Sequence, residues 1–158
     1  MSAFIHSPFM HAHSHLLCSS YLRLTGRPLI AQGQGDMPND ALLAESLYAA
    51  DVAIVSHDTA ADPIFNYANL QAQTLFGYDW EQFVHLPSRL SAEPMVREAR
   101  AALLQRVARD GYVDDYAGVR VTGDGRRFMI TRATVWNLHD AEGVYRGQAA
   151  CIHDWHGL

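Results

Sequence analysis

The chain has little cysteine, and its cysteines form no motif. Its 158 residues include two, Cys18 and Cys151, which stand far apart. Metal-binding and redox cysteines come in closely spaced sets, so neither chemistry is indicated. Structural disulfides belong to oxidising compartments, and this usage therefore favours a reduced, cytoplasmic protein. A chain of this length buries roughly 68–70% of its unfolded surface, enough to fold without a disulfide or metal.

Long apolar runs and runs of basic residues are also missing. No apolar segment approaches the ~20 residues of a membrane span. The N-terminus lacks the basic region and cleavage site of a signal peptide. The net charge is −5 and the pI about 5.9, with no dense lysine or arginine cluster. We therefore expect neither a membrane nor a nucleic acid as a partner.

Two helices are predicted ahead of the first strand. Apolar residues in 16–24 recur at i, i+4 and i+7, and Gly26 and Pro28 end that helix. A second helix follows a glycine-rich loop, with Asn39 or Asp40 as its N-cap. These helices either cover a face of the sheet or pair with a second chain.

Three alternating histidines, His11, His13 and His15, stand near the N-terminus. On a strand they would share one face and could chelate zinc or copper. In a helix or a frayed terminus, residues i and i+2 do not share a face. We interpret the run as a solvated terminal segment and predict no metal site.

The stretch 62–78 contains a strand, a hinge, a short helix and a stop. Residues 64–67 form the strand, and 52–55 are an earlier strand buried on both faces. Asn69 is placed to accept hydrogen bonds from the free amides of the next helix. Gly77 supplies the left-handed residue that ends this helix.

A short helix capped by Asp79 is followed by one long helix. Ser91 is predicted to begin the long helix and Gly111 to end it. Its buried stripe is Val96, Ala99, Leu103 and Val107.

The rest of the chain is predicted to form strands over 112–122, 127–138 and 145–155. The sequence of residues 123–125, Gly-Asp-Gly, indicates a hairpin between the first two. One predicted face of the first strand carries Val113, Ala117, Val119 and Val121. In the second, Phe128, Ile130 and Trp136 share one face, and Met129, Ala133 and Val135 the other. Because neither face is purely polar, both faces are expected to be covered.

This order of elements resembles the PAS topology. Residues 69–78 resemble the family's Asn-Pro-Ala-x-x-x-Leu-x-Gly-Tyr pattern, with Leu70 in place of proline, and 118–127 resemble the stretch before its Asp-Gly hairpin. A closer likeness is to the MEKHLA domain, a PAS-like module. It is carried by 19–29, 56–69, 86–94, 111–130, 133–138 and 145–150.

The resemblance implies an α+β, PAS-like fold. It has an antiparallel sheet of about five strands, short helices on one face, one long helix and an N-terminal helical extension. We place this extension at 1–38 and the PAS-like domain at 39–158. A sensory or regulatory role is implied. The sequence has no homeodomain or leucine zipper, so DNA binding, which belongs to plant members, is not carried over.

PAS domains often hold a small molecule between sheet and helices. Polar or aromatic side chains on otherwise apolar strands are the candidate ligand contacts: His57, Asn66, Tyr67, Arg89, Trp136 and Gln148. Each also has a structural interpretation. Asn66 would fix a turn, Tyr67 and Trp136 would be core aromatics, and Arg89 would pair with Glu93 or Asp114.

The positions of the cysteines and histidines bear on which of the known PAS cofactors this chain could hold. A photoactive flavin requires a cysteine on the helix after the first strands, and both cysteines lie elsewhere. Haem usually takes a histidine from the long helix, and 91–111 contains none, although His85 lies just upstream. Both are disfavoured. Non-covalent FAD is compatible with stacking by Trp80 or Trp136. An unknown small organic molecule is the preferred ligand.

Two other classes of function stay open. An enzyme needs a base and an orienting group, but His57 and Asp58 would point to opposite faces of a strand. The sequence has no phosphate loop, nucleophile elbow or HExxH motif, so an enzyme is not expected. A ligand-free interaction module would dimerise through its N-terminal helices and outer sheet face. We predict a homodimer that signals through a protein partner.

Overall fold

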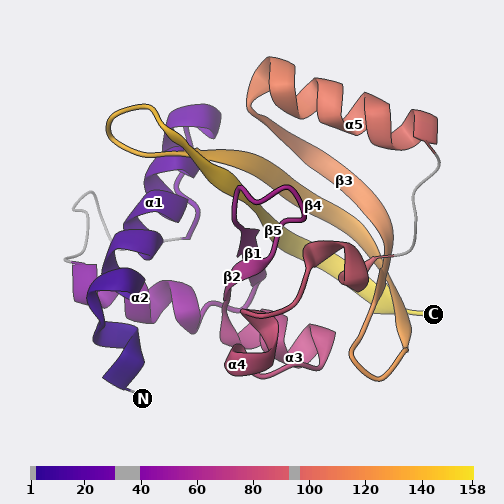
Figure 1. Cartoon of the computed structure of the whole chain (residues 1–158), viewed down its shortest axis with the longest axis horizontal. Coiled ribbons are helices and arrows are strands. Elements are labelled where there is room, and N and C mark those ends of the chain that lie inside the picture. The colour runs from indigo at the N-terminus through magenta and orange to yellow at the C-terminus, as the bar shows by residue number, and fades with distance from the viewer. Residues whose placement is uncertain (1–2, 31–39, 93–96) are drawn as a thin grey trace.

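The computed structural model describes residues 3–30, 40–92 and 97–158 (Figure 1). Its elements are η1 (Ala3–His6), α1 (Pro8–Thr25), α2 (Asp40–Tyr48), β1 (Ala53–His57), β2 (Phe65–Ala68), α3 (Leu70–Phe76), α4 (Trp80–Phe83), η2 (Ser88–Ser91), α5 (Arg97–Asp110), β3 (Tyr112–Val121), β4 (Arg127–His139) and β5 (Tyr145–Gly157). The five strands form one antiparallel sheet in the order β2-β1-β5-β4-β3. The predicted α+β architecture is confirmed.

Helices cover both faces of this sheet, and each face has its own apolar cluster. We call the face under η1, α1 and α2 the outer face, and the face under α3, α4, η2 and α5 the inner face (Figure 1). Ile54, Trp136 and Cys151 belong to the outer cluster. Val55 and Ile152 belong to the inner cluster. The predicted cover of the second face is thus supplied by the chain's own N-terminal helices.

Helix α1 begins earlier than its apolar spacing indicated. Ser7 accepts a hydrogen bond from the amide of Met10, and Pro8 occupies the first turn. Gly26 ends the helix with φ of 74°. His13 lies on the buried side of α1 with 6% of its surface exposed. The interpretation of the histidine run as a solvated segment was therefore wrong for His13. Among the described residues no cluster of metal-ligating side chains occurs.

Asn69 joins β1, α2 and α3. Its side-chain oxygen accepts from the amides of Ile54 and Ala72, both at 3.0 Å. Its side-chain nitrogen donates to the carbonyls of Leu47 at 3.1 Å and Val52 at 2.8 Å. The predicted N-cap is confirmed, and so is the left-handed stop at Gly77, with φ of 76°.

The long helix begins later than predicted. Ser91 is the last residue of η2, and Ala92 is extended and pairs with Arg120 across an isolated bridge, so the chain cannot start a helix at Ser91. Val96, one predicted stripe residue, lies outside the described residues. Ala99 is exposed, whereas Val107 is buried.

The predicted faces of β3 and β4 were partly wrong because each strand is bulged. Irregular pairing separates Val113 from Tyr116 on β3, and Ile130 from Ala133 on β4. Each bulge inserts a residue and reverses the alternation beyond it. The inner cluster contains Val113, Phe128, Ile130, Ala133 and Val135. Trp136 lies in the outer cluster, and Ala117 is exposed.

No helix in the described part of the chain is long and apolar enough to span a membrane. The division between an extension at 1–38 and a domain at 39–158 stays a prediction. In the structure α1 shares its apolar cluster with β1, β4 and β5.

Candidate functional site

Three polar side chains lie side by side across the centre of the sheet. His57 on β1 pairs with Gln148 on β5, and Gln148 pairs with Asn137 on β4. His57 lies two residues from the inner-face residue Val55, and Asn137 lies two residues from Val135, so both share that face. Gln148 is paired with both and lies on the same face. We call these three residues the polar row. Two of them, His57 and Gln148, were predicted ligand contacts.

Hydrogen bonds fix the polar row but leave part of it unused. The Gln148 amide nitrogen donates to the Asn137 side-chain oxygen at 3.2 Å. The Nδ1–H of His57 donates to the Asp58 carbonyl at 2.9 Å, since that oxygen can only accept. The second ring nitrogen of His57 and the Gln148 side-chain oxygen have no hydrogen-bond partner among the described residues. The row can therefore receive hydrogen bonds from a molecule with N–H or O–H groups.

The inner face is less completely covered than the outer face at this point. Ala150, on the central strand beside the row, is half-buried. Its neighbours on the same strand, Ala149 and Cys151, belong to the outer-face cluster and are 2% and 0% exposed. All three members of the row are half-buried as well. The middle of the inner face thus presents polar groups around a small apolar residue.

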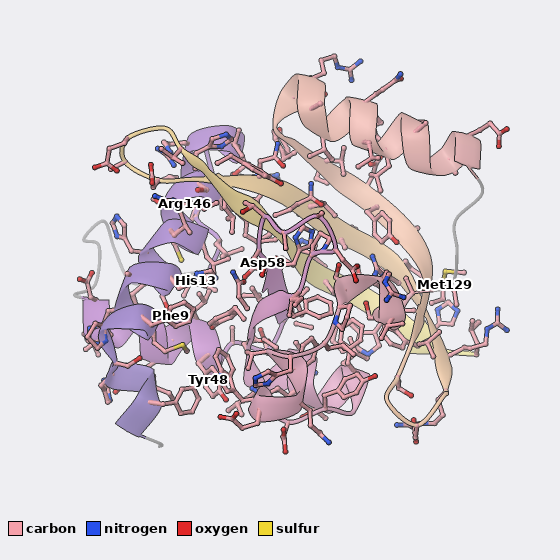
Figure 2. The ribbon with its side chains drawn as sticks, viewed as in Figure 1. Phe9, His13, Tyr48, Asp58, Met129 and Arg146 are labelled. Carbon is pink, nitrogen blue, oxygen red and sulfur yellow. The ribbon has the colours of Figure 1, made fainter. Side chains whose placement is uncertain are left out.

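A loop held by Asp58, which is labelled in Figure 2, directly follows His57 of the row. One carboxylate oxygen of Asp58 accepts from the amides of Ala60 at 3.1 Å and Ile64 at 3.0 Å. The His57 ring contacts the backbone of Asp58 and not its carboxylate. These two side chains therefore do not form the base and orienting group of an acid–base pair.

Tyr67 and Trp136 do not join the row, because they lie on the outer face. Tyr67 stacks on His13 with 5.6 Å between ring centroids. The indole N–H of Trp136 donates to the Leu17 carbonyl at 3.3 Å. Both side chains are fully buried. Burial raises the pKa of the Tyr67 hydroxyl well above its usual value, and within 3–30, 40–92 and 97–158 this hydroxyl has no hydrogen-bond partner.

Asn66 and Arg89 also lie apart from the row. The Asn66 side-chain oxygen accepts from the Ser56 hydroxyl at 2.6 Å. Arg89 pairs with Asp62 at 3.1 Å, and both side chains are more than half exposed. Of the six predicted ligand contacts, the structure therefore brings only His57 and Gln148 together.

The outer face contains a serine–histidine pair of a different kind. Nε2 of His13 lies 2.8 Å from the Ser56 hydroxyl oxygen. That hydroxyl gives its hydrogen to Asn66, so His13 must be the donor in this contact. Burial lowers the pKa of His13 to about 4. Ser56 is 1% exposed, and the pair is a buried structural link and not an accessible nucleophile with its base.

Both cysteines also belong to the outer cluster, and neither thiol lies on the inner face. Burial raises the pKa of the Cys18 thiol to about 12 and that of Cys151 to about 12. Both are therefore protonated, unreactive thiols near neutral pH.

One known family model matches nearly the whole chain. The model of the MEKHLA domain matches residues 11–157. The chain belongs to the MEKHLA domain family. No curated protein matches it. The match includes most of α1, the sheet and all inner-face helices of this MEKHLA domain.

Solved structures show the PAS fold. The PAS domain of a Colwellia psychrerythraea protein has a TM-score of 0.59 and 20% identity, over 70% of this chain and 92% of that one. An RNA-binding light-oxygen-voltage receptor has a TM-score of 0.63 and 23% identity over 80% of this chain, which spans 36% of the receptor. The fungal blue-light photoreceptor Vivid, as a light-state dimer, has a TM-score of 0.56 and 15% identity, covering 86% and 92%.

Sequence reasoning missed Asn137 as a member of the row. Asn137 is one of two polar residues, with Thr134, in the largely apolar run from Ala133 to Leu138. The polarity of Asn137 was a usable signal. Its face could not be read from the sequence because the bulge after Ile130 changes the alternation.

Proposed function

We propose that this MEKHLA domain is a sensory or regulatory module that binds a small organic molecule on the inner face of its sheet, at the polar row. The observation that supports it is the half-buried state of His57, Gln148, Asn137 and Ala150, at the centre of the sheet, where the outer-face residues beside them are buried. Ligand sites in proteins combine an apolar lining with a few placed polar groups. The row and its neighbours Val55 and Val135 have this composition.

A flavin is the cofactor that the structural neighbours suggest, since one of them was studied with a flavin analogue. The amide groups of Gln148 and Asn137 suit the polar edge of such a ring, so non-covalent binding fits these residues. Covalent attachment to a thiol does not fit, because both cysteines lie on the outer face. Trp136 lies on the outer face too, and Trp80 packs against Tyr48 and Tyr67, so neither stacks on a ring at the row.

We further propose that the domain acts as a homodimer and passes its signal to a protein partner. The neighbour Vivid was solved as a dimer in its light state. A ligand that prefers one dimer geometry shifts the population towards that geometry. Nucleic acid is not proposed as a partner, given the net charge of −5.

Native mass spectrometry of the purified chain, with an absorption spectrum of the same sample, tests the ligand. We expect mass to be released on denaturation of the wild type. Gln148→Leu, which removes the row's free acceptor at similar volume, should lose that mass. Gln105→Leu, an exposed glutamine on α5, should retain it. No released mass from the wild type, or equal mass from Gln148→Leu, would contradict the proposal.

A further inference from the structure

One arginine lies on the inner face near the edge of the sheet. Arg120 pairs with Phe128, and Phe128 belongs to the inner cluster. The Arg120 guanidinium carbon is 5.5 Å from the centre of the Tyr116 ring, four residues back on the same strand. The side chain therefore runs along the edge strand β3 towards Tyr116, over the inner face, and not away from the sheet.

The partners of Arg120 are neutral. One terminal nitrogen donates to the Ser91 hydroxyl at 3.3 Å, and the other to the Tyr116 hydroxyl at 3.2 Å. Its Nε is buried and has no acceptor among the residues that the structure describes. Among the described residues, no carboxylate lies within ion-pair distance of this guanidinium.

Most other arginines of the chain form an ion pair, whereas Arg23 is exposed and donates to Ser20 and the His139 carbonyl. Seven are exposed and paired with an aspartate: Arg27, Arg89, Arg106, Arg109, Arg126, Arg132 and Arg146. Arg120 is half-buried. In a chain with 17 acidic and 12 basic residues, a half-buried guanidinium facing only hydroxyl groups is unusual. A desolvated cation is stabilised by a paired anion, so this one is suited to an anion from outside the chain.

The local backbone places a second donor beside the guanidinium. A Cβ at Gly118 would lie 2.7 Å from the Tyr116 hydroxyl, so glycine allows this hydroxyl to lie against the strand. The hydroxyl accepts from Arg120, and no group in the described part of the chain accepts its own hydrogen, which can therefore be donated. Ser91, in contrast, already gives its hydrogen to the Ser88 carbonyl at 2.7 Å. Arg120 and Tyr116 together thus offer N–H and O–H donors to one oxyanion.

We propose that the molecule bound on the inner face carries an oxyanion group, a carboxylate or a phosphate, which Arg120 binds with the help of the Tyr116 hydroxyl. This inference rests on the proposed function and names the chemical class of its ligand. Arginine presents planar, parallel N–H groups that match both oxyanions. The polar row then contacts a different, uncharged part of the molecule.

Titration of the full chain with sodium phosphate and, separately, sodium acetate tests this assignment. Binding is followed by NMR at constant ionic strength with chloride as the balancing anion. We expect saturable shifts of the amides around Arg120 with at least one of the two anions, and the responding anion distinguishes phosphate from carboxylate. Arg120→Met should weaken that binding about tenfold or more. Arg89→Met, at an exposed and paired arginine, should leave it unchanged.

Tyr116→Phe guards against a folding artefact, because it removes only the hydroxyl. It should weaken anion binding while circular dichroism and the unfolding midpoint stay close to wild type. Equal anion binding by wild type and Arg120→Met, or no saturable binding by wild type, would overturn the assignment.

The two proposals fail in different ways. A co-purified molecule that is lost in Gln148→Leu and retained in Arg120→Met would support the inner-face ligand and overturn its anionic character. Saturable anion binding without any co-purified molecule would support the Arg120 assignment and count against the proposed ligand.

Discussion

The two faces of the sheet differ in what their polar groups do. On the outer face, polar side chains such as His13 and Ser56 are buried and bond to each other under α1. On the inner face, Gln148 and Asn137 are half-buried and keep unused hydrogen-bonding capacity. Polar groups that are fully enclosed fix a structure, whereas polar groups with free capacity are available to a ligand. The outer face is thus built for stability and the inner face for binding.

The largest expected effect comes from the outer cluster. Trp136→Ala removes a fully buried side chain and its hydrogen bond to Leu17, and should cost about 3–5 kcal/mol of unfolding free energy. Gln148→Ala, at a half-buried inner-face position, should cost less than about 1 kcal/mol. Urea denaturation monitored by fluorescence and circular dichroism compares the two. Equal costs would end the distinction between the faces.

Asn69 connects the two sides, and its loss should come next. Asn69→Ala removes the α3 cap and leaves the Ile54 amide and the Leu47 and Val52 carbonyls without this partner. We expect a cost of about 2–4 kcal/mol in urea denaturation. Asn69→Asp keeps the capping oxygen and loses both donors, so it should recover only part of this cost. Full recovery would show that the cap alone matters.

Stability should depend on pH through His13. Burial lowers its folded-state pKa from 6.5 to about 4, so the unfolded chain binds a proton between these values that the folded chain does not. This contribution is fully present above pH 6.5 and is lost as the pH falls towards 4. Between pH 6.5 and 5 the loss should be about 2 kcal/mol.

Equilibrium denaturation at several pH values measures this slope. His13→Gln should flatten it, and His15→Gln, at an exposed position of the same helix, should preserve it. An unchanged slope in His13→Gln would assign the effect to other groups.

The smallest effect is expected at Arg89. Its ion pair with Asp62 is exposed to solvent, and such pairs contribute about 0–1 kcal/mol. Arg89→Ala should therefore change the unfolding free energy by no more than about 0.5 kcal/mol. A double-mutant cycle with Asp62→Ala measures the pair itself. A large coupling energy would mean that Arg89 is more than a surface residue.

The features that the sequence predicted correctly have local causes. As cap and stop of α3, Asn69 and Gly77 act on backbone groups within four residues, so these two roles could be read directly from the sequence. The bonds of Asn69 to Leu47, Val52 and Ile54 are distant in the sequence and could not. The number and antiparallel pairing of the strands followed from the resemblance to PAS and MEKHLA domains. The start of α5 was misplaced because Ala92 pairs with Arg120, a contact distant in the sequence.

The candidate site was harder to predict because it depends on which face each strand residue occupies. Trp136 was assigned to the same face as Phe128, but the β4 bulge puts them on opposite sides. Tyr67 was a reasonable ligand contact by residue type, and only its stacking on His13 shows that it lies under α1. Residue type identified candidates, and the bulges decided which of them meet.

The alternation of β5 has a consequence for how this sequence can change in evolution. Ala149 and Cys151 lie on the outer face, while Gln148 and Ala150 lie on the inner face. Deleting or duplicating a single codon within this strand would move the outer-face residues to the inner face and the inner-face residues to the outer face. The Gln148 side chain would then lie under α1. The exposed residues 141–144, in the turn before β5, can change in number without moving any residue from one face of the sheet to the other. Length variation among natural homologues should therefore be found in that turn and be rare within 147–152.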